Sequence, residues 1–291
     1  MIVRAGLAAL CSLLAVPTAA AAQSSFAEQR AQWNAPIAPF RILGNVYYVG
    51  TAHIAAYLVT DSAGHVLIDG GMEESAPQIA ANIRRLGFRI EDVRVLLINH
   101  AHWDHAGGLA ELRRLSGARL AASTTDSADL ERGSNADRDD LAPFAPVTVD
   151  RHVEDGDALR LGAIELTAHL TPGHTPGCTT WTMRTSEAGR DYDVLFACSL
   201  TVAGRALVGD DRYPQAAHDF ETSFARLRTL PADVFLGFHD NQFDLEAKRR
   251  RLLAGQALAF VDPSEARRRI DAAEADFRRE LERQRAGARA R

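Results

Sequence analysis

Lysine is almost absent from this chain of 291 residues: Lys248 is its single example among 33 basic residues. Acidic residues number 38, so the formal net charge is −5. A nucleic-acid-binding surface needs a basic face that contacts phosphates, and this balance therefore argues against nucleic acid as the partner. We attribute the use of arginine in place of lysine to genomic composition rather than to a functional site.

The motifs of serine-dependent hydrolases are also absent. The sequence contains neither a Ser-x-x-Lys nor a Gly-x-Ser-x-Gly motif, and Lys248 is preceded by Leu245-Glu-Ala. A hydrolase built from this sequence is therefore not expected to use a serine nucleophile of these classes.

Long apolar runs are missing beyond the first residues. Arg4 precedes an apolar run over 5–16, and the small residues of 17–22 follow it. This order is typical of a secretory signal peptide. The alternative is a membrane anchor, but a bilayer span needs about 20 apolar residues and this run is shorter. We predict that 1–22 is a signal peptide cleaved near Ala22, that 23–291 reaches the periplasm, and that no part of it remains in the membrane.

Only three cysteines are present, and Cys11 would leave with the signal peptide. Cys178 and Cys198 remain, an even pair in a compartment that favours oxidation.

The periodicity of apolar residues predicts an α/β protein. Strands and helices are followed by a second series of strands and helices, which favours one domain (23–291) of two similar halves whose mixed sheets pack face to face. The last segment, 265–291, is rich in Arg and Glu and favours a charged, solvated C-terminal helix over an interaction tail. The expected strands are 40–50, 55–60, 65–69, 93–98, at least two within 147–171, 178–184, 192–200 and 234–238, and the expected helices are 73–86, 109–115, 216–230 and segments within 245–253 and 263–285.

A cluster of metal-binding residue types follows the buried strand 93–98. His100, His102, Asp104 and His105 lie within six residues, and imidazole nitrogens and carboxylate oxygens are good zinc ligands. The spacing of His100 and His102 lets both side chains point the same way, whereas the adjacent Asp104 and His105 must diverge and could serve a second metal. Single buried histidines are usually hydrogen-bonded core residues, but that role does not explain three of them beside an aspartate.

This segment resembles the HxHxDH signature of the metallo-β-lactamase superfamily. The segments 66–71, 171–177 and 237–239 are similar to other parts of that family. The resemblance implies a four-layered αβ/βα sandwich with helices outside. It also implies two zinc ions per chain. His100, His102 and His174 would hold one, and Asp104, His105 and His239 the other.

Asp69 occupies the family's strand-end position, where it would support the site by hydrogen bonding. The alternative is a simple turn-forming aspartate before Gly70.

The segment 196–201, Phe-Ala-Cys-Ser-Leu-Thr, distinguishes members of the family. Glyoxalase II-like enzymes and many lactonases carry a metal-bridging aspartate at this place. The segment 196–201 of this sequence contains no carboxylate. B1 and B2 β-lactamases carry a cysteine ligand, and subclass B3 carries a serine. Aligning on Leu200 places Ser199 at this position and Cys198 one residue earlier, and neighbours on a strand face opposite sides.

The predicted hairpin with its turn at 185–190 places Cys178 and Cys198 opposite each other, so we expect a disulfide that removes Cys198 from metal binding. A free Cys198 thiolate as metal ligand is the competing interpretation.

Other segments also resemble subclass B3, namely 33–36, 211–214 and 243–245. The resemblance implies that Trp33 lies on a segment that passes over the active site and could stack on the substrate; the alternative is a packed tryptophan. It also implies that the hydroxyls of Ser199 and Thr201 bind metal-bound water and the substrate carboxylate; the alternative is that they cap the strand end.

The resemblance therefore implies a β-lactamase that hydrolyses penicillins, cephalosporins and carbapenems and confers antibiotic resistance. Zinc lowers the pKa of bound water from about 15.7 to about 7, and a zinc-bound hydroxide oriented by Asp104 would attack the lactam without a covalent intermediate. We expect a monomer whose partner is a small-molecule β-lactam.

Two alternatives stay open. The first is a zinc hydrolase of lactones or thioesters, disfavoured by the missing bridging carboxylate. The second is a non-enzymatic zinc-binding protein, disfavoured because structural zinc sites are usually closed by four protein ligands.

Overall fold

The computed structural model describes residues 19–290 of the chain. The predicted signal peptide lies largely outside these residues, and its last four residues, 19–22, begin a helix, α1 (Ala19–Trp33). None of the helices within residues 19–290 combines the length and the apolar character that a membrane span requires.

Two mixed sheets form the centre of the molecule. In the seven-stranded sheet, β1 to β4 form an antiparallel meander and β4 to β7 are parallel. In the five-stranded sheet, β8 to β11 are antiparallel and β12 is parallel to β11. The first sheet contains β1 (Phe40–Leu43), β2 (Val46–Tyr48), β3 (Tyr57–Asp61), β4 (Gly64–Ile68), β5 (Val93–Leu97), β6 (Arg119–Ser123) and β7 (Arg151–Val153). The second contains β8 (Ala158–Leu161), β9 (Ile164–Leu170), β10 (Thr179–Glu187), β11 (Arg190–Phe196) and β12 (Val234–Leu236).

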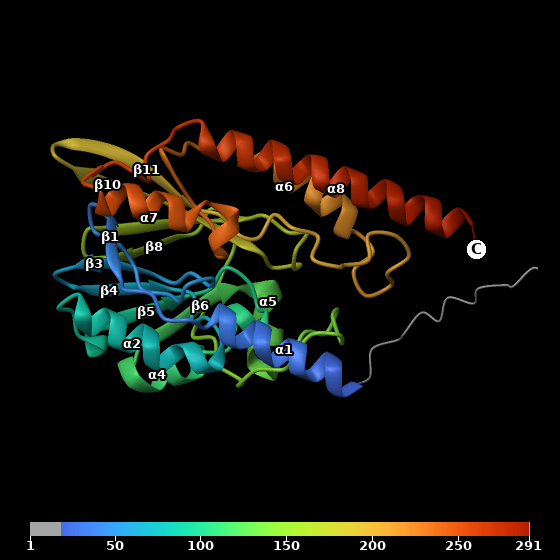
Figure 1. The fold of residues 1–291 in the computed structure, drawn as a ribbon, viewed down its shortest axis with the longest axis horizontal. Helices are drawn as coiled ribbons and strands as arrows, with labels where there is room; N and C mark the ends of the chain where they lie inside the picture. The colour runs from blue at the N-terminus through green and yellow to red at the C-terminus, as the bar shows by residue number, and fades with distance from the viewer. Residues whose placement is uncertain (1–18, 291) are drawn as a thin grey trace, which may run out of the picture.

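Helices cover both outer faces, as Figure 1 shows. The predicted four-layered sandwich is thereby confirmed. The helices on the side of the first sheet include α2 (Ala76–Arg85) and α4 (Leu109–Ser116), and those on the side of the second are α6 (Ala216–Leu227), α7 (Leu245–Leu253) and α8 (Glu265–Arg289). The short α3 (Trp103–Ala106), α5 (Thr124–Arg132) and the single turns η1 (Glu73–Ser75), η2 (Ile90–Asp92) and η3 (Asp240–Gln242) complete the fold.

The charged C-terminal segment is more than a solvated helix. One face of α8 carries Ile270, Phe277 and Leu281, which are buried in a cluster with Phe220 and Phe224 of α6. The other face carries the expected Arg–Glu pairs, such as those of Glu274 with Arg278 and Glu280 with Arg283.

Besides the short α3 and the single turns η2 and η3, three elements were not expected from the sequence. Strand β6 reads Arg-Leu-Ala-Ala-Ser and lacks the β-branched and aromatic residues that mark strands. Helix α5 begins where the Ser123 hydroxyl accepts a hydrogen bond from the Asp126 amide, a capping pattern that the sequence could have revealed. Helix α1 begins within the predicted signal peptide and continues beyond its expected cleavage point.

Two buried contacts between the sheets align the strand ends that matter for the site. The indole nitrogen of Trp181 in β10 donates to the carbonyl of Ile98, just after β5, at 3.2 Å. The hydroxyl of Tyr57 in β3 donates to the carbonyl of Gly237, just after β12. Both side chains are fully buried, so these contacts form without competition from water.

Candidate metal centre

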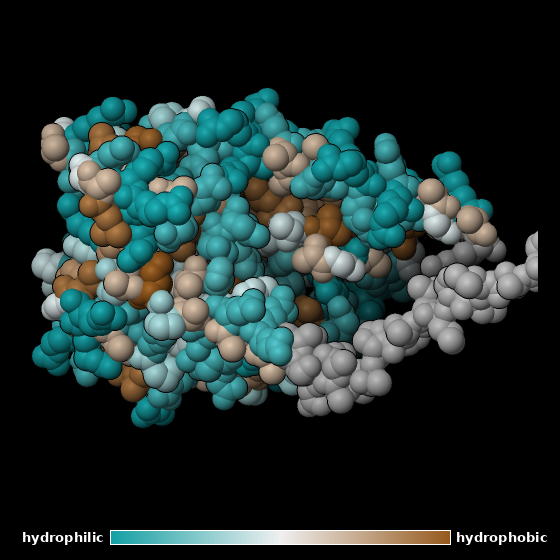
Figure 2. Space-filling model, in the orientation of Figure 1, coloured by the Kyte–Doolittle hydropathy of each residue, from teal (hydrophilic) through white to brown (hydrophobic). Residues whose placement is uncertain are grey.

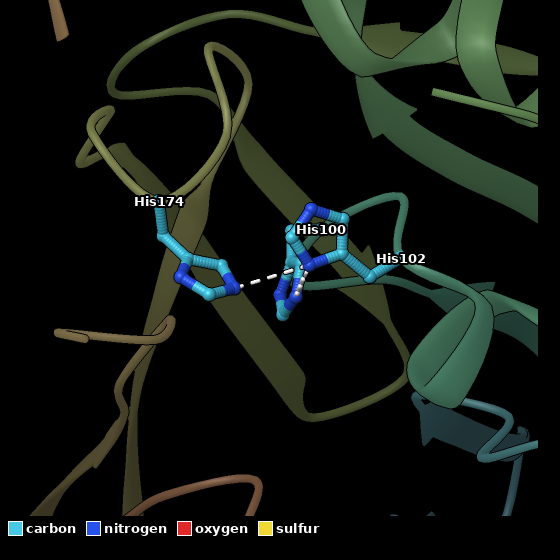
Figure 3. Close-up of side chains that lie close together, drawn as sticks. All are labelled: His100, His102 and His174. Carbon is cyan, nitrogen blue, oxygen red and sulfur yellow. Dashed lines mark hydrogen bonds between the residues drawn. The ribbon is translucent and has the colours of Figure 1, made fainter. Parts of the chain in front are cut away.

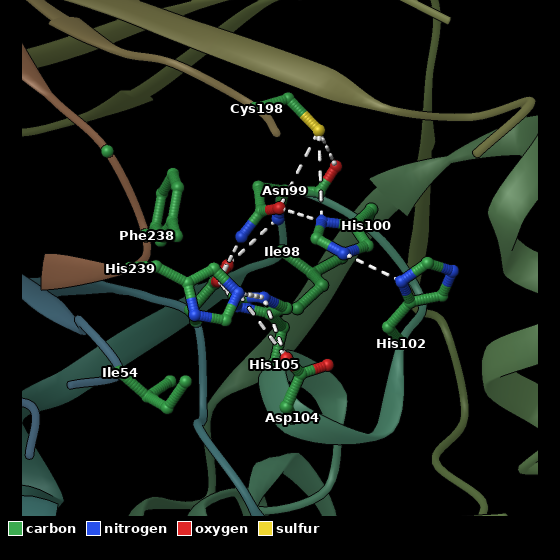
Figure 4. Close-up of polar contacts among 12 residues, drawn as sticks. Ile54, Ile98, Asn99, His100, His102, Asp104, His105, Cys198, Phe238 and His239 are labelled. Atoms are coloured by element: carbon green, nitrogen blue, oxygen red, sulfur yellow. Dashed lines mark hydrogen bonds and ion pairs between the residues drawn. The ribbon is translucent and has the colours of Figure 1, made fainter. Parts of the chain in front are cut away.

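Six predicted ligands converge where strands of both sheets end. His100 and His102 follow β5, Asp104 and His105 lie on α3, His174 follows β9, and His239 follows β12. Their donor atoms form two groups, each within 4.8 Å: His100, His102 and His174, and Asp104, His105 and His239. The structure therefore brings together every residue of the predicted ligand set. Figure 3 shows the first group, and Figure 4 shows the second group beside His100 and His102.

In the first group, three ring nitrogens face one another. The Nδ1 atom of His102 lies 3.1 Å from Nε2 of His100 and 3.1 Å from Nε2 of His174. His174 Nδ1–H donates to the carbonyl of Thr201 at 2.7 Å, and His100 Nδ1–H donates to the Asn99 side-chain oxygen. The Nε2 atoms of His100 and His174 therefore carry free lone pairs and can only accept hydrogen bonds. A single proton on His102 Nδ1 could satisfy only one of these two atoms. A cation between the three nitrogens satisfies them all.

In the second group, His105 Nε2 lies 3.2 Å from His239 Nε2. The Asp104 carboxylate lies 3.5 Å from the first of these nitrogens and 3.4 Å from the second. His105 Nδ1–H donates to Asp69 at 3.0 Å, which leaves Nε2 free to bind a metal.

Asp69 is placed to orient rings in both groups. It is fully buried, and its carboxylate accepts the Asn99 amide proton at 2.9 Å in addition to the protons of His105 and of the Asn99 side chain. Asn99 in turn accepts the proton of His100, so Asp69 reaches His100 through one intervening amide. Burial raises the pKa of Asp69 to about 6, against the opposing effect of its hydrogen bond to His105.

Burial keeps most of the imidazoles neutral. It lowers the pKa of His174 to about 3 and that of His239 to about 4, and it holds the pKa of His100 and His102 well below the ordinary value. For His105, burial acts in the same direction, but Asp104 and Asp69 outweigh it and raise the pKa. Neutral imidazoles with a carboxylate form the nitrogen and oxygen donor set that zinc prefers, so the residues fit a divalent metal.

Both groups open onto one cavity of about 540 Å³. The surface is hollowed beside α1 in Figure 2, and α1 contributes Phe26, Gln29 and Trp33 to the cavity wall. Trp33 stacks on Trp103 with ring centroids 6.0 Å apart and meets His239 edge-on at 5.4 Å. It is thus both packed and part of the wall. The remaining lining residues are His102, Trp103, Asp104, Arg138, Asp140, Leu141, Ala142, His174, Thr201, Ala203 and His239.

The hydroxyls predicted to bind substrate lie at the end of β11. Thr201 lines the cavity, and the Ser199 hydroxyl lies 3.1 Å from the Thr201 hydroxyl. Ser199 itself is buried behind Thr201 and does not line the cavity. The structure thus pairs the two hydroxyls but presents one of them to the cavity.

The predicted disulfide is confirmed: Cys178 and Cys198 are bonded, with Cα atoms 5.9 Å apart. They lie just beyond the paired ends of β10 and β11, where Trp181 is opposite Phe196. Cys198 therefore has no free thiolate, and Ser199 is the residue of this pair whose side chain lies beside the cavity wall.

Two further residues hold the ligand loops and were missed from the sequence. The buried Asp126 carboxylate accepts protons from the amides of Ala101 and Gly177 and from the Thr175 hydroxyl, at 2.8–3.0 Å. Burial raises its pKa to about 7. Because these contacts span 25 to 51 residues, no local pattern could have indicated them.

Arg205 is the second such residue and is fully buried. Its guanidinium donates twice to the carbonyl of His174, at 3.1 and 2.8 Å, and lies over the ring of Tyr213. It also approaches Asp137 to 2.6 Å, as an ion pair rather than an aligned hydrogen bond. Arg205 thus ties the His174 loop to the loop that follows α5.

Comparison with known proteins places this site in a family. The family model described as the metallo-beta-lactamase superfamily matches residues 49–239, which include all six predicted ligands. The chain belongs to the metallo-β-lactamase superfamily.

Solved structures narrow the resemblance. The chain is similar to BJP-1 of Bradyrhizobium japonicum, a subclass B3 metallo-beta-lactamase, with 40% identity and a TM-score of 0.84 over 88% of this chain and 98% of that one. The Rm3 metallo-beta-lactamase is 42% identical, with a TM-score of 0.86 over 89% and 98%. FEZ-1 from Legionella gormanii is 40% identical, with a TM-score of 0.84 over 87% and 98%.

Curated relatives include members with other activities. A hydroxyacylglutathione hydrolase from Rhodopseudomonas palustris (strain BisB5) is 30% identical over 180 residues, which cover 62% of this chain and 59% of the relative. The human mitochondrial persulfide dioxygenase ETHE1 is 34% identical over 184 residues, which cover 62% of this chain and 61% of that relative. The chain thus matches about three-fifths of the length of these relatives.

Proposed function

We propose that this metallo-hydrolase is a β-lactamase of subclass B3 that binds two zinc ions and opens the lactam ring of penicillins, cephalosporins and carbapenems. The observation that carries the proposal is the donor set: Asp104, His105 and His239 form the second group. Residues 197–201, after β11, contribute a disulfide-bonded cysteine and two hydroxyls but no carboxylate. Similarity of about 40% to β-lactamases along nearly their whole length supports it.

His100, His102 and His174 would hold the first zinc, and Asp104, His105 and His239 the second. Zinc supplies a strong water-derived nucleophile at neutral pH and polarises a carbonyl oxygen. The Asp104 carboxylate borders the cavity and can also accept a proton from the attacking water, which orients it toward the lactam carbonyl. Because no serine or cysteine attacks, no acyl-enzyme forms.

The chain's own side chains would position the substrate. Thr201 lines the cavity, and its hydroxyl, which lies beside that of Ser199, can donate to the carboxylate that β-lactams carry. Trp33 offers an apolar ring beside His239 for the substrate's ring system. Each contact lies on the wall next to a metal group, so binding and chemistry share one cavity.

We further propose that 1–22 is a signal peptide and that 23–291 acts as a single-domain monomer in the periplasm, where it confers antibiotic resistance. Measurement of the N-terminal residue of protein recovered from the periplasm tests this. A first residue beyond Ala22 is expected, and protein retained whole in the cytosol contradicts it.

The activity is tested by following carbapenem hydrolysis by the zinc-loaded mature protein, with and without a chelator. Turnover that disappears with the chelator and returns with added zinc is expected. A protein that binds zinc but hydrolyses no penicillin, cephalosporin or carbapenem would contradict the proposal and leave the fold and the metal centre standing.

Thioester or lactone hydrolysis is the second candidate, because hydroxyacylglutathione hydrolases are among the relatives. Against it, the segment 196–201 contains no carboxylate that could bridge two metals. A panel of glutathione thioesters and lactones, measured beside the lactams, decides between the two by kcat/KM.

A further inference from the structure

The disulfide lies against the side of His100 that faces away from the other ligands. His100 Nε2 faces His102, whereas Nδ1 lies 3.8 Å from the Cys198 sulfur. The same sulfur lies 3.3 Å from the Asn99 carbonyl oxygen, and Figure 4 shows Cys198, Asn99 and His100 in contact. His100 is therefore shared between two clusters, one on each edge of its ring.

The second cluster contains the residue types of a soft-metal site. The two sulfurs and a nitrogen of His100 all lie within 4.8 Å of one another, and all three residues are buried. Thiolates with imidazole bind zinc, cadmium and cuprous ions strongly. In the oxidised protein this cluster has no thiolate, because both sulfurs are consumed in the disulfide.

We propose that reduction of the disulfide creates a thiolate metal site from Cys178, Cys198 and His100, which takes a soft cation such as Zn²⁺ or Cd²⁺ and withdraws His100 from the first catalytic group. The inference rests on the proposed function only in counting His100 as a ligand of the first zinc. It assigns the disulfide a second role beyond joining the ends of β10 and β11: it keeps His100 available to the first group.

The competition follows from the chemistry of one ring. A neutral imidazole has a single ring nitrogen with a free lone pair, and the Asn99 side-chain oxygen, which can only accept, requires the proton of His100 on Nδ1. Binding a metal through Nδ1 moves that proton to Nε2, which then no longer serves the first group. One ring can therefore complete one site or the other.

The steps balance in atoms and electrons. A phosphine reductant gives two electrons to the disulfide and becomes a phosphine oxide, with the oxygen supplied by one water molecule and its two hydrogens delivered to the sulfurs. The cation then binds the two thiolates and releases two protons. Cys198 also lines a second cavity, of about 230 Å³, against α8.

The test compares oxidised protein with protein refolded in a phosphine reductant, each loaded with ¹¹³Cd²⁺ and observed by cadmium NMR and near-ultraviolet absorption. The oxidised protein is expected to show only nitrogen- and oxygen-bound cadmium. The reduced protein is expected to gain one sulfur-bound signal with its thiolate charge-transfer band, and to lose the signal of the first group. The matched control is the double variant Cys178→Ser, Cys198→Ser, which should keep the signals of the oxidised protein in the presence of reductant.

Should the double variant not fold, the oxidised protein is the control, since it has the same side chains and no thiolate. Absence of a sulfur-bound signal from reduced, folded protein overturns the site. A sulfur-bound signal beside two unchanged catalytic signals overturns the competition for His100. Lactam hydrolysis is measured only on the oxidised protein, so a failure of the proposed function and a failure of this inference are seen in different experiments.

Discussion

At the scale of single residues, Asp69 has the widest influence on the metal centre. It holds His105 directly and His100 through Asn99, so one carboxylate orients a ring in each ligand group. Its backbone has a φ of 65°, in the left-handed region that Asp and Asn tolerate better than other side chains. The supporting role of Asp69 could be predicted from its position in the motif, whereas the bridging role of Asn99 could not, because it depends on how two loops meet.

We expect Asp69→Asn to weaken metal binding without unfolding the protein. Asparagine tolerates the left-handed backbone conformation of residue 69 as well as aspartate does. Its side-chain N–H group, however, would face another donor, either His105 Nδ1–H or the side-chain amide of Asn99, where the carboxylate accepts from both. Loss of such supporting contacts lowers metal affinity by about 10–100-fold. Zinc affinity measured by competition with a chromogenic chelator checks this. Asp155→Asn, an exposed carboxylate paired with Arg226, is the control, and equal affinities of the two variants would refute the prediction.

At the scale of elements, buried charges pin loops and helices around the site. Lys248, the single lysine, joins α7 to Glu265 at the first turn of α8. Its ammonium lies 5.5 Å from the rings of Phe243 and Phe260, and burial lowers its pKa. These side chains fix the beginning of the long C-terminal helix over β12.

We expect Lys248→Met to destabilise the fold strongly. It removes the buried ammonium from the Glu265 carboxylate and leaves only the partly exposed Arg269, at 3.3 Å, as a partner. Breaking a buried pair costs about 3–5 kcal/mol, and we expect a loss at the lower end of that range. The free energy of unfolding, measured in urea, should recover in the double variant Lys248→Met, Glu265→Leu. Arg250→Ala removes an exposed partner of Glu246 and should cost less than about 1 kcal/mol. A loss in Lys248→Met no larger than in this control would show that the buried pair contributes little.

Arg205 joins two loops through buried polar contacts, as Lys248 joins two helices. We expect Arg205→Gln to lower the free energy of unfolding by about 3–5 kcal/mol, because Asp137 is left buried and unpaired. Zinc affinity of the first group should also fall, because the His174 carbonyl loses both of its guanidinium donors. Arg212→Gln is the control on the same loop, since its partner Asp139 is exposed. If zinc affinity were unchanged while stability fell, Arg205 would be a structural residue alone.

At the scale of the whole molecule, the candidate metal centre joins the two sheets. His100, His102, Asp104 and His105 follow a strand of the first sheet, and His174 and His239 follow strands of the second. A metal ion at this place would bind only the folded chain, because the ligands come together only when the two sheets have packed.

We therefore expect metal removal to destabilise the entire fold. Free zinc at 100 times its dissociation constant stabilises a folded protein by about 2.7 kcal/mol, which for a chain of this size corresponds to roughly 5–10 °C in Tm. Thermal unfolding followed by circular dichroism, before and after chelation, measures this shift. A chelator already saturated with zinc is the control. An unchanged Tm after proven metal loss would mean that packing alone holds the sheets together.

Several features could be predicted from the sequence because they depend on neighbours along the chain. Four of the six predicted ligands lie within six residues, and the other two follow predicted strands whose ends meet at one edge. The disulfide follows from the register of a single hairpin. In both cases the geometry is local to a short segment, and the hydrophobic pattern predicts the strands that place that segment in the fold.

Only the tertiary structure decided how these parts are supported. Asn99 links the two ligand groups, and Asp126 and Arg205 bind loops far apart in sequence. Each of these contacts joins separate segments that meet only after the sheets have packed. A buried polar side chain takes its partner from whatever the fold brings near, and sequence periodicity carries no information about that partner.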